Sequence, residues 1–394
     1  MIRVAFPLFG GAGWTGGLNY LRSVLSALHQ YASGQVQAVL FASPDARPGD
    51  IDSLRPYLHE APVIVPGWSS DRKARLSRAF QTYVLQSDLV SLSAFRRADI
   101  DLVFQQDAWY GWAFQMKTLV WLADFQHERL PGMFTPIKRL RRSAVYAGLA
   151  RTATSILLSS ESAANDARRF LPSNSADKFC VSPFAVMTPA AITSSAIDAT
   201  RTQLALPEKY VFLPNQLWKH KNHLRVVEAV KLLKQRQVDI RIIATGNPND
   251  PRHPEHPDHI LREIELNGLG THLKFLGLVE YRHILPMLAQ SHALLNPSLF
   301  EGWSTTVEEA KALGRPLVLS NIDVHVEQAR EVDAIFFDPN STEELAGALT
   351  KVWMRPQDPN QQETVSLALS RYEERRQAFA DRLTNAFRTA TAHR

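Results

Sequence analysis

The sequence predicts an α/β protein with two domains, each built from a parallel sheet covered by helices on both faces. Short apolar runs that suit buried strands alternate with amphipathic, helix-like stretches along the chain. A segment rich in Ala, Thr, Ser and Pro, from Val186 to Arg201, separates two such sets and indicates a linker. With 394 residues, the chain can form about two or three domains that each bury a core.

The composition is that of an ordinary soluble protein, with 45% apolar and 21% charged residues. The single cysteine, Cys180, excludes an internal disulfide framework and fits a reducing compartment. We find no targeting segment and no apolar run near the roughly 18 residues of a membrane span. We therefore expect a cytoplasmic protein. The net charge of +5 is too small to indicate nucleic acid, so we expect no such partner.

The first set begins with a strand, Ile2–Phe9, followed by the glycine-rich loop Gly10–Gly17 and a helix from Leu18 to Leu28. Such a loop lets the backbone approach a phosphate or sugar closely, although an ordinary tight turn explains the glycines equally well. We also expect one helix from Asp71 to Ser93. Five further strands are expected in this set: Val36–Phe41, Val63–Val65, Asp101–Gln105, Thr118–Ala123 and Thr154–Leu158.

Polar residues follow the expected strand Thr118–Ala123, among them Asp124 and His127. In α/β proteins, groups at the carboxyl ends of strands face the ligand crevice. Imidazole titrates near neutral pH and can accept or donate a proton or a hydrogen bond. A merely solvated loop histidine is the alternative interpretation of His127.

The second set opens with the strand Tyr210–Leu213 and continues into a loop with Gln216, Lys219 and Lys221. Two lysines between a strand and a helix can meet a diphosphate. Later strands end at Gly246 and before Leu278. Three histidines, His253, His256 and His259, lie among prolines, which break the helix that would align them as metal ligands. We therefore expect no metal site.

The stretch Leu299–Leu319 carries the strongest signal. A buried strand precedes it, and Thr305-x-x-Glu308 and Thr306-x-x-Glu309 have capping-box spacing, which predicts a helix from near Thr306. A helix that starts at the carboxyl end of a strand points its free N–H groups into the ligand crevice. Glu301 and Glu309 beside such an anion-binding end suit a ligand with both phosphate and hydroxyls, such as a sugar nucleotide. An ordinary capped helix with acidic first-turn residues is the alternative.

The pattern PSLFEGWSTTVEEA resembles the signature of glycosyltransferase family 4, which has two Glu separated by seven residues. The resemblance covers nearly the whole chain in element order. It implies the GT-B fold, with two Rossmann-like domains whose parallel sheets face each other across a cleft. It assigns residues 1–190 to an acceptor-side domain, 200–365 to a nucleotide-sugar-binding domain, and 366–394 to a helix that returns to the first domain.

The resemblance also implies roles for individual residues. Glu301 would contact hydroxyls of the donor sugar, and Glu309 would hold the ribose diol. His127 would lie near the transferred sugar, and Asp124 would orient or deprotonate the acceptor. Gln216 stands where the family commonly has Arg, so either Lys219 supplies the missing positive charge or diphosphate binding is weaker. The other implied donor-site residues are Gly16, Gly17, Lys221, Gly246, Leu278, Val279, Ser304, Thr305 and Thr306.

The implied activity is that of a retaining glycosyltransferase of the kind that builds bacterial surface polysaccharide. It would move a hexose or deoxyhexose from a GDP-sugar or UDP-sugar to a glycan or lipid-linked acceptor, without a metal or other cofactor. Two alternatives stay open: a nucleotide-sugar-binding protein without catalysis and a GT-B sugar-nucleotide epimerase. The basic clusters Arg72–Arg78 and Lys138–Arg142 are either solvated faces or contacts to an acceptor, which can be lipid-linked, or to the inner face of a membrane.

Overall fold

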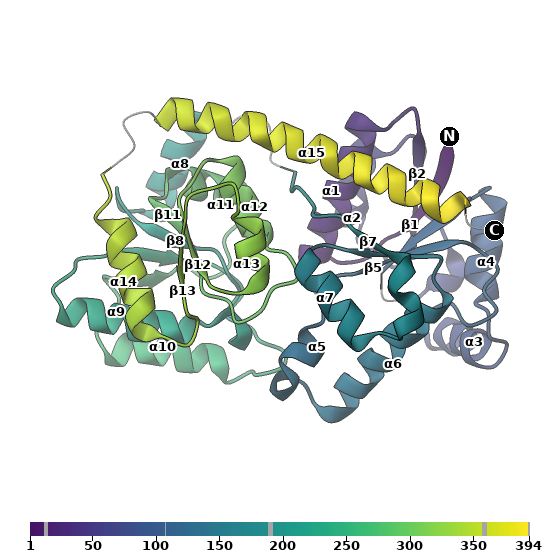
Figure 1. Ribbon diagram of the computed structural model, residues 1–394, viewed down its shortest axis with the longest axis horizontal. Helices are drawn as coiled ribbons and strands as arrows, with labels where there is room; N and C mark the ends of the chain where they lie inside the picture. The colour runs from purple at the N-terminus through teal and green to yellow at the C-terminus, as the bar shows by residue number, and fades with distance from the viewer. Residues whose placement is uncertain (12–14, 107, 188–191, 357–360, 393–394) are drawn as a thin grey trace. The chain divides into compact units, whose positions relative to one another are not determined.

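The computed structural model describes residues 1–11, 15–106, 108–187, 192–356 and 361–392. The chain forms two compact units. Unit 1 comprises Met1–Pro131, Thr135–Met187 and Glu374–Arg394, and unit 2 comprises Gly132–Phe134 and Thr188–Glu373. Each unit contains a parallel sheet between helices (Figure 1), which confirms the predicted two-domain α/β fold.

The described residues of unit 1 form a seven-stranded sheet in the order β3-β2-β1-β4-β5-β6-β7, with every pairing parallel. The order reverses direction between β1 and β4, which makes their carboxyl ends the switch point where α/β sheets bind ligands. The strands are β1 (Ile2–Pro7), β2 (Val36–Ala42), β3 (Val63–Ile64), β4 (Leu102–Gln105), β5 (Thr118–Leu122), β6 (Ser155–Leu158) and β7 (Phe179–Val181). The helices are α1 (Thr15–Tyr31), α2 (Pro48–Asp52), α3 (Arg72–Tyr83), α4 (Leu89–Arg97), α5 (Gln126–Arg129), α6 (Pro136–Thr152) and α7 (Glu161–Phe170).

Over its described residues, unit 2 repeats this plan with six parallel strands in the order β10-β9-β8-β11-β12-β13. Here the switch point lies between β8 and β11. The strands are β8 (Val211–Leu213), β9 (Ile242–Ala244), β10 (Leu273–Phe275), β11 (Ala293–Asn296), β12 (Leu317–Ser320) and β13 (Ala334–Phe337). The helices are α8 (Ser194–Leu204), α9 (His223–Gln235), α10 (His256–Leu266), α11 (Tyr281–Gln290), α12 (Thr305–Ala312), α13 (Asp323–Gln328) and α14 (Thr342–Trp353).

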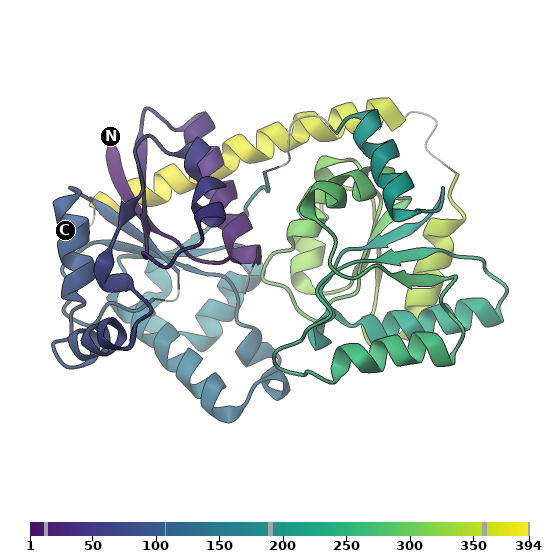
Figure 2. The same ribbon diagram turned by 180° about the vertical axis from the view of Figure 1, so that it is seen from behind.

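Alternation along the strands divides the core of unit 2 into two layers, because successive side chains of a strand point to opposite faces. Phe212 and Leu294 belong to the layer that includes residues of α11 and α12. Val211, Leu213 and Leu295 belong to the layer that includes residues of α9, α10 and α14. Figure 2 shows the two helix layers of this unit from behind, with the sheet between them. Burial on both faces explains why the central strands of unit 2 are apolar up to their last residues.

Three elements differ from what the sequence predicted. The helix expected from Asp71 to Ser93 is two helices: α3 ends at Tyr83, and Asp88 caps the start of α4 by accepting the N–H of Ser91 at 3.0 Å. The boundary between the two units, at Met187 and Thr188, falls within the expected linker, but its later residues belong to the helix α8, which Thr193 caps. Strand β7 is only three residues long and was not predicted.

The terminal helix α15 (Gln361–Ala392) contributes residues to both units. From Glu374 onward it belongs to unit 1, where Phe379 and Phe387 are buried. In that unit Arg376 donates to the Ser26 hydroxyl at 3.3 Å, and Arg382 donates to the carbonyl of Pro183 at 3.1 Å. Among the described helices, none is long and apolar enough to span a bilayer.

Gly246 illustrates a backbone requirement of this fold. Its φ is +148°, and a Cβ there would lie 2.5 Å from the carbonyl oxygen of Asn215. We expect Gly246→Ala to lower the unfolding free energy of unit 2 by about 1–3 kcal/mol. Gly347→Ala is the control, because a Cβ in that α14 position meets nothing within 4 Å and should stabilise the helix by about 0.5–1 kcal/mol. Urea unfolding measures both, and equal stability of the two variants would contradict the packing argument.

Candidate functional site

The loops that leave β8 and β11 are joined at the switch point of unit 2. The N–H of Leu299 donates to the carbonyl of His220 at 2.8 Å, and the Asn222 side chain donates to the carbonyl of Pro297 at 3.2 Å. At the end of the strands themselves, Asn215 donates to Asn296 Oδ1 at 3.2 Å. These bonds hold one loop with lysines against another loop with a carboxylate.

Lys221 and Glu301 meet in these loops. Lys221 Nζ lies 2.5 Å from Glu301 Oε1, and the Ser298 hydroxyl donates to the same oxygen at 2.7 Å. The side chains are only 15% and 10% exposed. Burial alone would raise the pKa of Glu301, but the charge of Lys221 and the hydrogen bonds from Lys221 and Ser298 outweigh it, so this pKa is lowered. In acid, where His325 is protonated, its charge also lowers the pKa of Glu301. Glu301 is therefore ionised at neutral pH.

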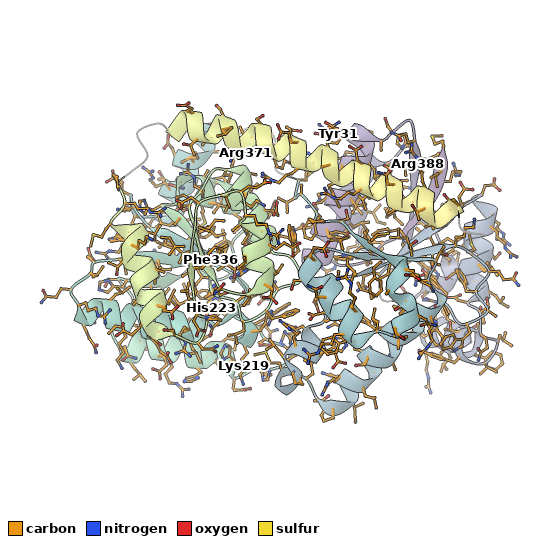
Figure 3. All side chains as sticks on the ribbon, in the orientation of Figure 1. Tyr31, Lys219, His223, Phe336, Arg371 and Arg388 are labelled. Carbon is orange, nitrogen blue, oxygen red and sulfur yellow. The ribbon has the colours of Figure 1, made fainter. Side chains whose placement is uncertain are left out.

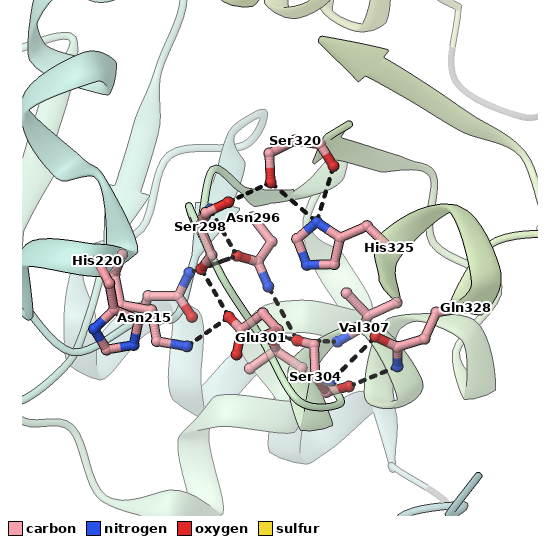
Figure 4. A network of polar contacts seen from close by, with 12 residues as sticks. Asn215, His220, Asn296, Ser298, Glu301, Ser304, Val307, Ser320, His325 and Gln328 are labelled. Atoms are coloured by element: carbon pink, nitrogen blue, oxygen red, sulfur yellow. Dashed lines mark hydrogen bonds and ion pairs between the residues drawn. The ribbon is translucent and has the colours of Figure 1, made fainter. Parts of the chain in front are cut away.

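A buried polar network places Glu301 relative to the start of α12 (Figure 4). Asn296, fully buried at the end of β11, accepts from the Ser298 hydroxyl at 2.7 Å and donates to the Ser304 hydroxyl at 3.0 Å. Ser320, at the end of β12, donates to the carbonyl of Ser298 at 2.6 Å. Two neighbouring strand ends thus fix the loop that carries Glu301.

His325 of α13 completes this network at Ser320. Its Nδ1 lies 3.0 Å from the carbonyl oxygen of Ser320, and a carbonyl only accepts, so Nδ1 carries the proton. Burial lowers the pKa of His325 to about 4, against the opposing effects of Glu301 and the Ser320 carbonyl. The ring is therefore neutral at neutral pH and acts as a fixed donor.

The helix α12 begins differently from the prediction. Ser304 is the N-cap, with its hydroxyl accepting from the N–H of Val307, so the two Thr-x-x-Glu pairs are not capping boxes. Gln328 of α13 holds this cap from outside the helix. Its side chain accepts from the N–H of Ser304 at 3.0 Å and donates to the carbonyl of Ser304 at 3.1 Å. The same amide reaches Glu308, which is buried and paired with Lys311 at 3.0 Å. Glu308 therefore has a structural role.

Glu309 lies in the second turn of α12, not in its first turn as predicted, because the helix starts at Thr305. Its side chain is 5% exposed and accepts from the Tyr281 hydroxyl at 3.1 Å. Burial raises the pKa of Glu309 to about 7, and the Tyr281 hydrogen bond opposes this only in part. Near neutral pH this carboxyl can both donate and accept hydrogen bonds.

Other predicted donor residues lie along the same edge of the sheet. The N–H of Gly246 donates to the carbonyl of Gly277 at 2.9 Å, which joins the loops after β9 and β10. Val279 packs against the core, whereas Leu278 is exposed. Lys219, labelled in Figure 3, has an exposed side chain, and its N–H donates to Asp250 at 2.9 Å. Gln216 is half-buried in the same loop.

In unit 1, Asp124 follows β5, as predicted. It accepts from Arg142 at 3.0 Å and from the N–H of Gln126 at 2.9 Å. His127 lies in α5 and is 1% exposed, with its ring edge-on to Tyr146 at 5.2 Å. Burial first, and then the charge of Arg142, lower the pKa of His127 to about 4, although Glu128 and Asp124 oppose the shift. The ring is neutral at neutral pH, so it can exchange hydrogen bonds but does not supply a cation.

Gly16 and Gly17 are helical residues of α1, whereas we had predicted that they belong to the loop. The loop positions 12–14 lie outside the described residues. The glycine that this turn requires is Gly10, which has a φ of +87° and whose Cβ would lie 2.2 Å from the N atom of Leu18. Gly16 and Gly17 can still present N–H groups, because the first turn of a helix has no intrahelical acceptors for them.

No set of three or more His, Cys, Asp or Glu side chains could hold a metal ion within the described part of the chain. The prolines near His256 do not prevent a helix, since Pro257 occupies the first turn of α10. His256 and His259 are therefore both helical, and that part of the argument was wrong. That the protein's reaction needs no metal stays a prediction.

Residues 197–365 match the model of the family Glycosyl transferases group 1. The match covers most of unit 2, which is therefore similar to group 1 glycosyltransferases. The predicted resemblance is confirmed at this level, and membership of family 4 stays a prediction. A search of curated protein sequences gives no match.

Solved structures show the same two-unit fold. Anabaena Alr3699/HepE in complex with UDP and glucose has a TM-score of 0.70 at 15% identity, with 98% of this chain and 99% of that chain covered. Sucrose-phosphate synthase from Thermosynechococcus elongatus has a TM-score of 0.67 at 16% identity, with 98% of each chain covered. WaaG, a glycosyltransferase involved in lipopolysaccharide biosynthesis, has a TM-score of 0.57 at 15% identity, with 97% of this chain and 95% of that chain covered. The fold is GT-B.

Four site residues were not among the predicted ones: Asn296, Ser298, His325 and Gln328. The first two could have been found, because a polar Asn-x-Ser that ends an apolar strand signals a hydrogen-bonded strand exit. His325 and Gln328 lie on a separate helix that sequence periodicity does not place against α12. Their contacts depend on tertiary packing alone.

The raised pKa of Glu309 predicts a pH-dependent stability. The ordinary value is 4.5 and the folded value about 7, so the stabilisation by the neutral carboxyl is complete below pH 4.5 and is lost as the pH rises through 7. This difference corresponds to about 3 kcal/mol. We expect Glu309→Gln to gain about this much unfolding free energy relative to wild type between pH 5 and 8 in urea unfolding. Parallel pH profiles for the two proteins would contradict the assignment.

Proposed function

We propose that this protein is a retaining glycosyltransferase that moves a hexose or deoxyhexose from a nucleotide diphosphate sugar to a glycan or lipid-linked acceptor. One observation carries the proposal. A capped helix start, a buried Lys221–Glu301 pair and the buried Glu309 all occur at the switch-point edge of a unit that is similar to group 1 glycosyltransferases. That edge is where parallel sheets bind nucleotides.

The diphosphate of the donor would bind at Lys221 and at the N–H groups of Thr305 and Thr306. These two amides lie in the first turn of α12, where the helix supplies no acceptor and its dipole favours an anion. As the bond between the sugar and the diphosphate breaks, negative charge grows on the leaving oxygen. A cation and oriented amides that are already in place stabilise that charge. In the proposed mechanism the acceptor hydroxyl attacks on the face that the diphosphate leaves, and the diphosphate accepts the proton.

The two carboxyl groups have different ionisation and therefore different tasks. Glu301 is ionised and lies between Lys221 and the Ser298 hydroxyl, so it suits acceptance of hydrogen bonds from donor-sugar hydroxyls. Glu309, with a pKa of about 7, suits the ribose diol, which both donates and accepts. The loops at Gly246 and Gly277 would border the base, with Leu278 and Val279.

Unit 1 would supply the remaining groups. Asp124 would orient the acceptor, and neutral His127 would exchange a hydrogen bond with the transferred sugar. The first-turn amides of Gly16 and Gly17 would meet the donor phosphates. We further propose a UDP-sugar or GDP-sugar as donor, no metal requirement, a cytoplasmic location and a role in polysaccharide biosynthesis. Complexes of the Anabaena protein of similar fold with UDP and UDP-glucose support a nucleotide-sugar donor.

A binding protein without catalysis is the second candidate. Gln216 favours it, because this position of the β8 loop carries an amide instead of a cation. Calorimetry with UDP- and GDP-sugars, followed by an assay of donor hydrolysis, separates the two. If the protein binds a UDP-sugar or a GDP-sugar but does not slowly hydrolyse it, the second candidate is favoured. Conversion of the free donor sugar without any acceptor would instead indicate an epimerase.

The two neighbouring lysines provide a matched pair of variants. We expect Lys221→Ala to reduce turnover at least about tenfold, because one preorganised electrostatic contact is lost. Lys219→Ala should have a much smaller effect, since its side chain is exposed and Lys221 would still contact the diphosphate. Steady-state kinetics with donor hydrolysis as readout measures both. A wild-type rate in Lys221→Ala would place the diphosphate elsewhere.

Glu309→Ala tests the nucleotide end of the site. We expect this variant to weaken nucleotide binding or to abolish turnover. The protein should stay folded, because Glu309 has a raised pKa and forms no ion pair with any residue that the structure describes, so its removal leaves no buried charge unpaired there. Calorimetric titration with UDP and GDP measures the effect, and circular dichroism checks the fold. Unchanged binding and activity would remove Glu309 from the site.

A further inference from the structure

Helix α3 of unit 1 exposes apolar side chains to solvent, whereas a surface helix usually exposes polar ones. Leu76, Phe80, Tyr83 and the C-cap residue Val84 are each between 55% and 61% exposed. Their spacing of i, i+4, i+7 and i+8 places them on one face. We call these four residues the α3 stripe. Helices at the surface of a globular protein normally bury such a stripe.

The opposite face of α3, which packs on unit 1, is polar. Arg78 pairs with Asp88 at 3.2 Å, Gln81 accepts from the N–H of Val90 at 3.2 Å, and Thr82 is the buried residue of the helix. These contacts hold α3 in this orientation. The α3 stripe therefore faces outward because of specific bonds, and its apolar side chains contribute little to the core of the unit.

Aromatic side chains extend the α3 stripe. Tyr83 lies edge-on to Trp109 at 5.7 Å, and Trp109 lies edge-on to Trp112, which is exposed, at 5.1 Å. The segment around Trp112 is held against the end of α3, because the N–H of Ala113 donates to the carbonyl of Gln86 at 2.7 Å. Gly111, with a φ of +101°, permits this contact, since a Cβ there would lie 2.3 Å from the same carbonyl oxygen.

Cations share the surface with the α3 stripe. Arg72 lies one turn before Leu76 on the same face, and Lys73 and Arg75 are exposed beside it. The nearby carboxylates, Asp45 and Asp71, accept N–H groups of the backbone at Ser70 and Ala74. Exposed apolar and aromatic side chains flanked by Arg and Lys are the composition of helices that lie in the interface of an anionic bilayer.

We propose that α3 docks unit 1 on an anionic lipid surface, with the α3 stripe in the headgroup region and Arg72, Lys73 and Arg75 at lipid phosphates. Charge favours a lipid over a second copy of the chain, because two identical faces would bring these cations together. The proposal concerns unit 1 alone and does not depend on the donor chemistry.

Vesicle cosedimentation of the full-length protein tests this proposal. The vesicles contain phosphatidylcholine alone or phosphatidylcholine with phosphatidylglycerol. We expect binding to the anionic vesicles that weakens with salt. The double variant Leu76→Ser/Phe80→Ser should bind at least about tenfold more weakly, because two apolar side chains no longer leave water. Each of Arg72→Gln and Lys73→Gln should weaken binding about fivefold.

Leu266→Ser is the matched control, because Leu266 is a similarly exposed leucine on α10 of unit 2 and should leave vesicle binding unchanged. Thermal unfolding should be alike in all variants, since the altered side chains are exposed. Equal vesicle binding by wild type and the double variant would overturn the proposal. A wild-type dimer in sedimentation velocity that the double variant dissociates, without any vesicle binding, would also overturn it and would assign the α3 stripe to self-association.

Discussion

The contact between Lys221 and Glu301 is the interaction on which the rest of the candidate site depends. A carboxylate and an ammonium so far from solvent are costly unless both are paired and hydrogen-bonded. Ser298 supplies the additional hydrogen bond to Glu301, and Asn296 fixes Ser298 from the end of β11. The parallel sheet therefore does more than form a core. The neighbouring strands β8 and β11 end at the same edge of the sheet, and the loops that follow them bring Lys221 and Glu301 together.

The same network sets the helix start beside the ion pair. Asn296 also donates to Ser304, and Gln328 holds both the N–H and the carbonyl of that residue. An anion that approaches α12 would thus meet a fixed cap, a lysine and an ionised carboxylate. Such preorganisation reduces the rearrangement needed when charge develops on a leaving group. It also explains why so many polar groups are buried at one edge of an apolar sheet.

The positions of most strands, the two parallel sheets and the polar loop that carries Glu301 were predictable from the sequence, because buried parallel strands are short apolar runs and strand exits are polar. The order of the strands within each sheet was not predicted. Glu301, Glu309 and Lys221 were recognisable from motif spacing. Other features depend on packing. Ser304 caps α12 instead of a threonine because Asn296 and Gln328 hold it, and both contacts join residues from different elements. The outward α3 stripe was not predicted either, since its orientation depends on Arg78 and Gln81.

The most direct test of the central claim is a crystal structure of the protein with an intact nucleotide sugar bound. We expect diphosphate oxygens within hydrogen-bond distance of Lys221 Nζ and of the amide nitrogens at positions 305 and 306, with Glu301 at sugar hydroxyls. A nucleotide sugar whose diphosphate lies away from Lys221 and from the start of α12 would contradict that claim.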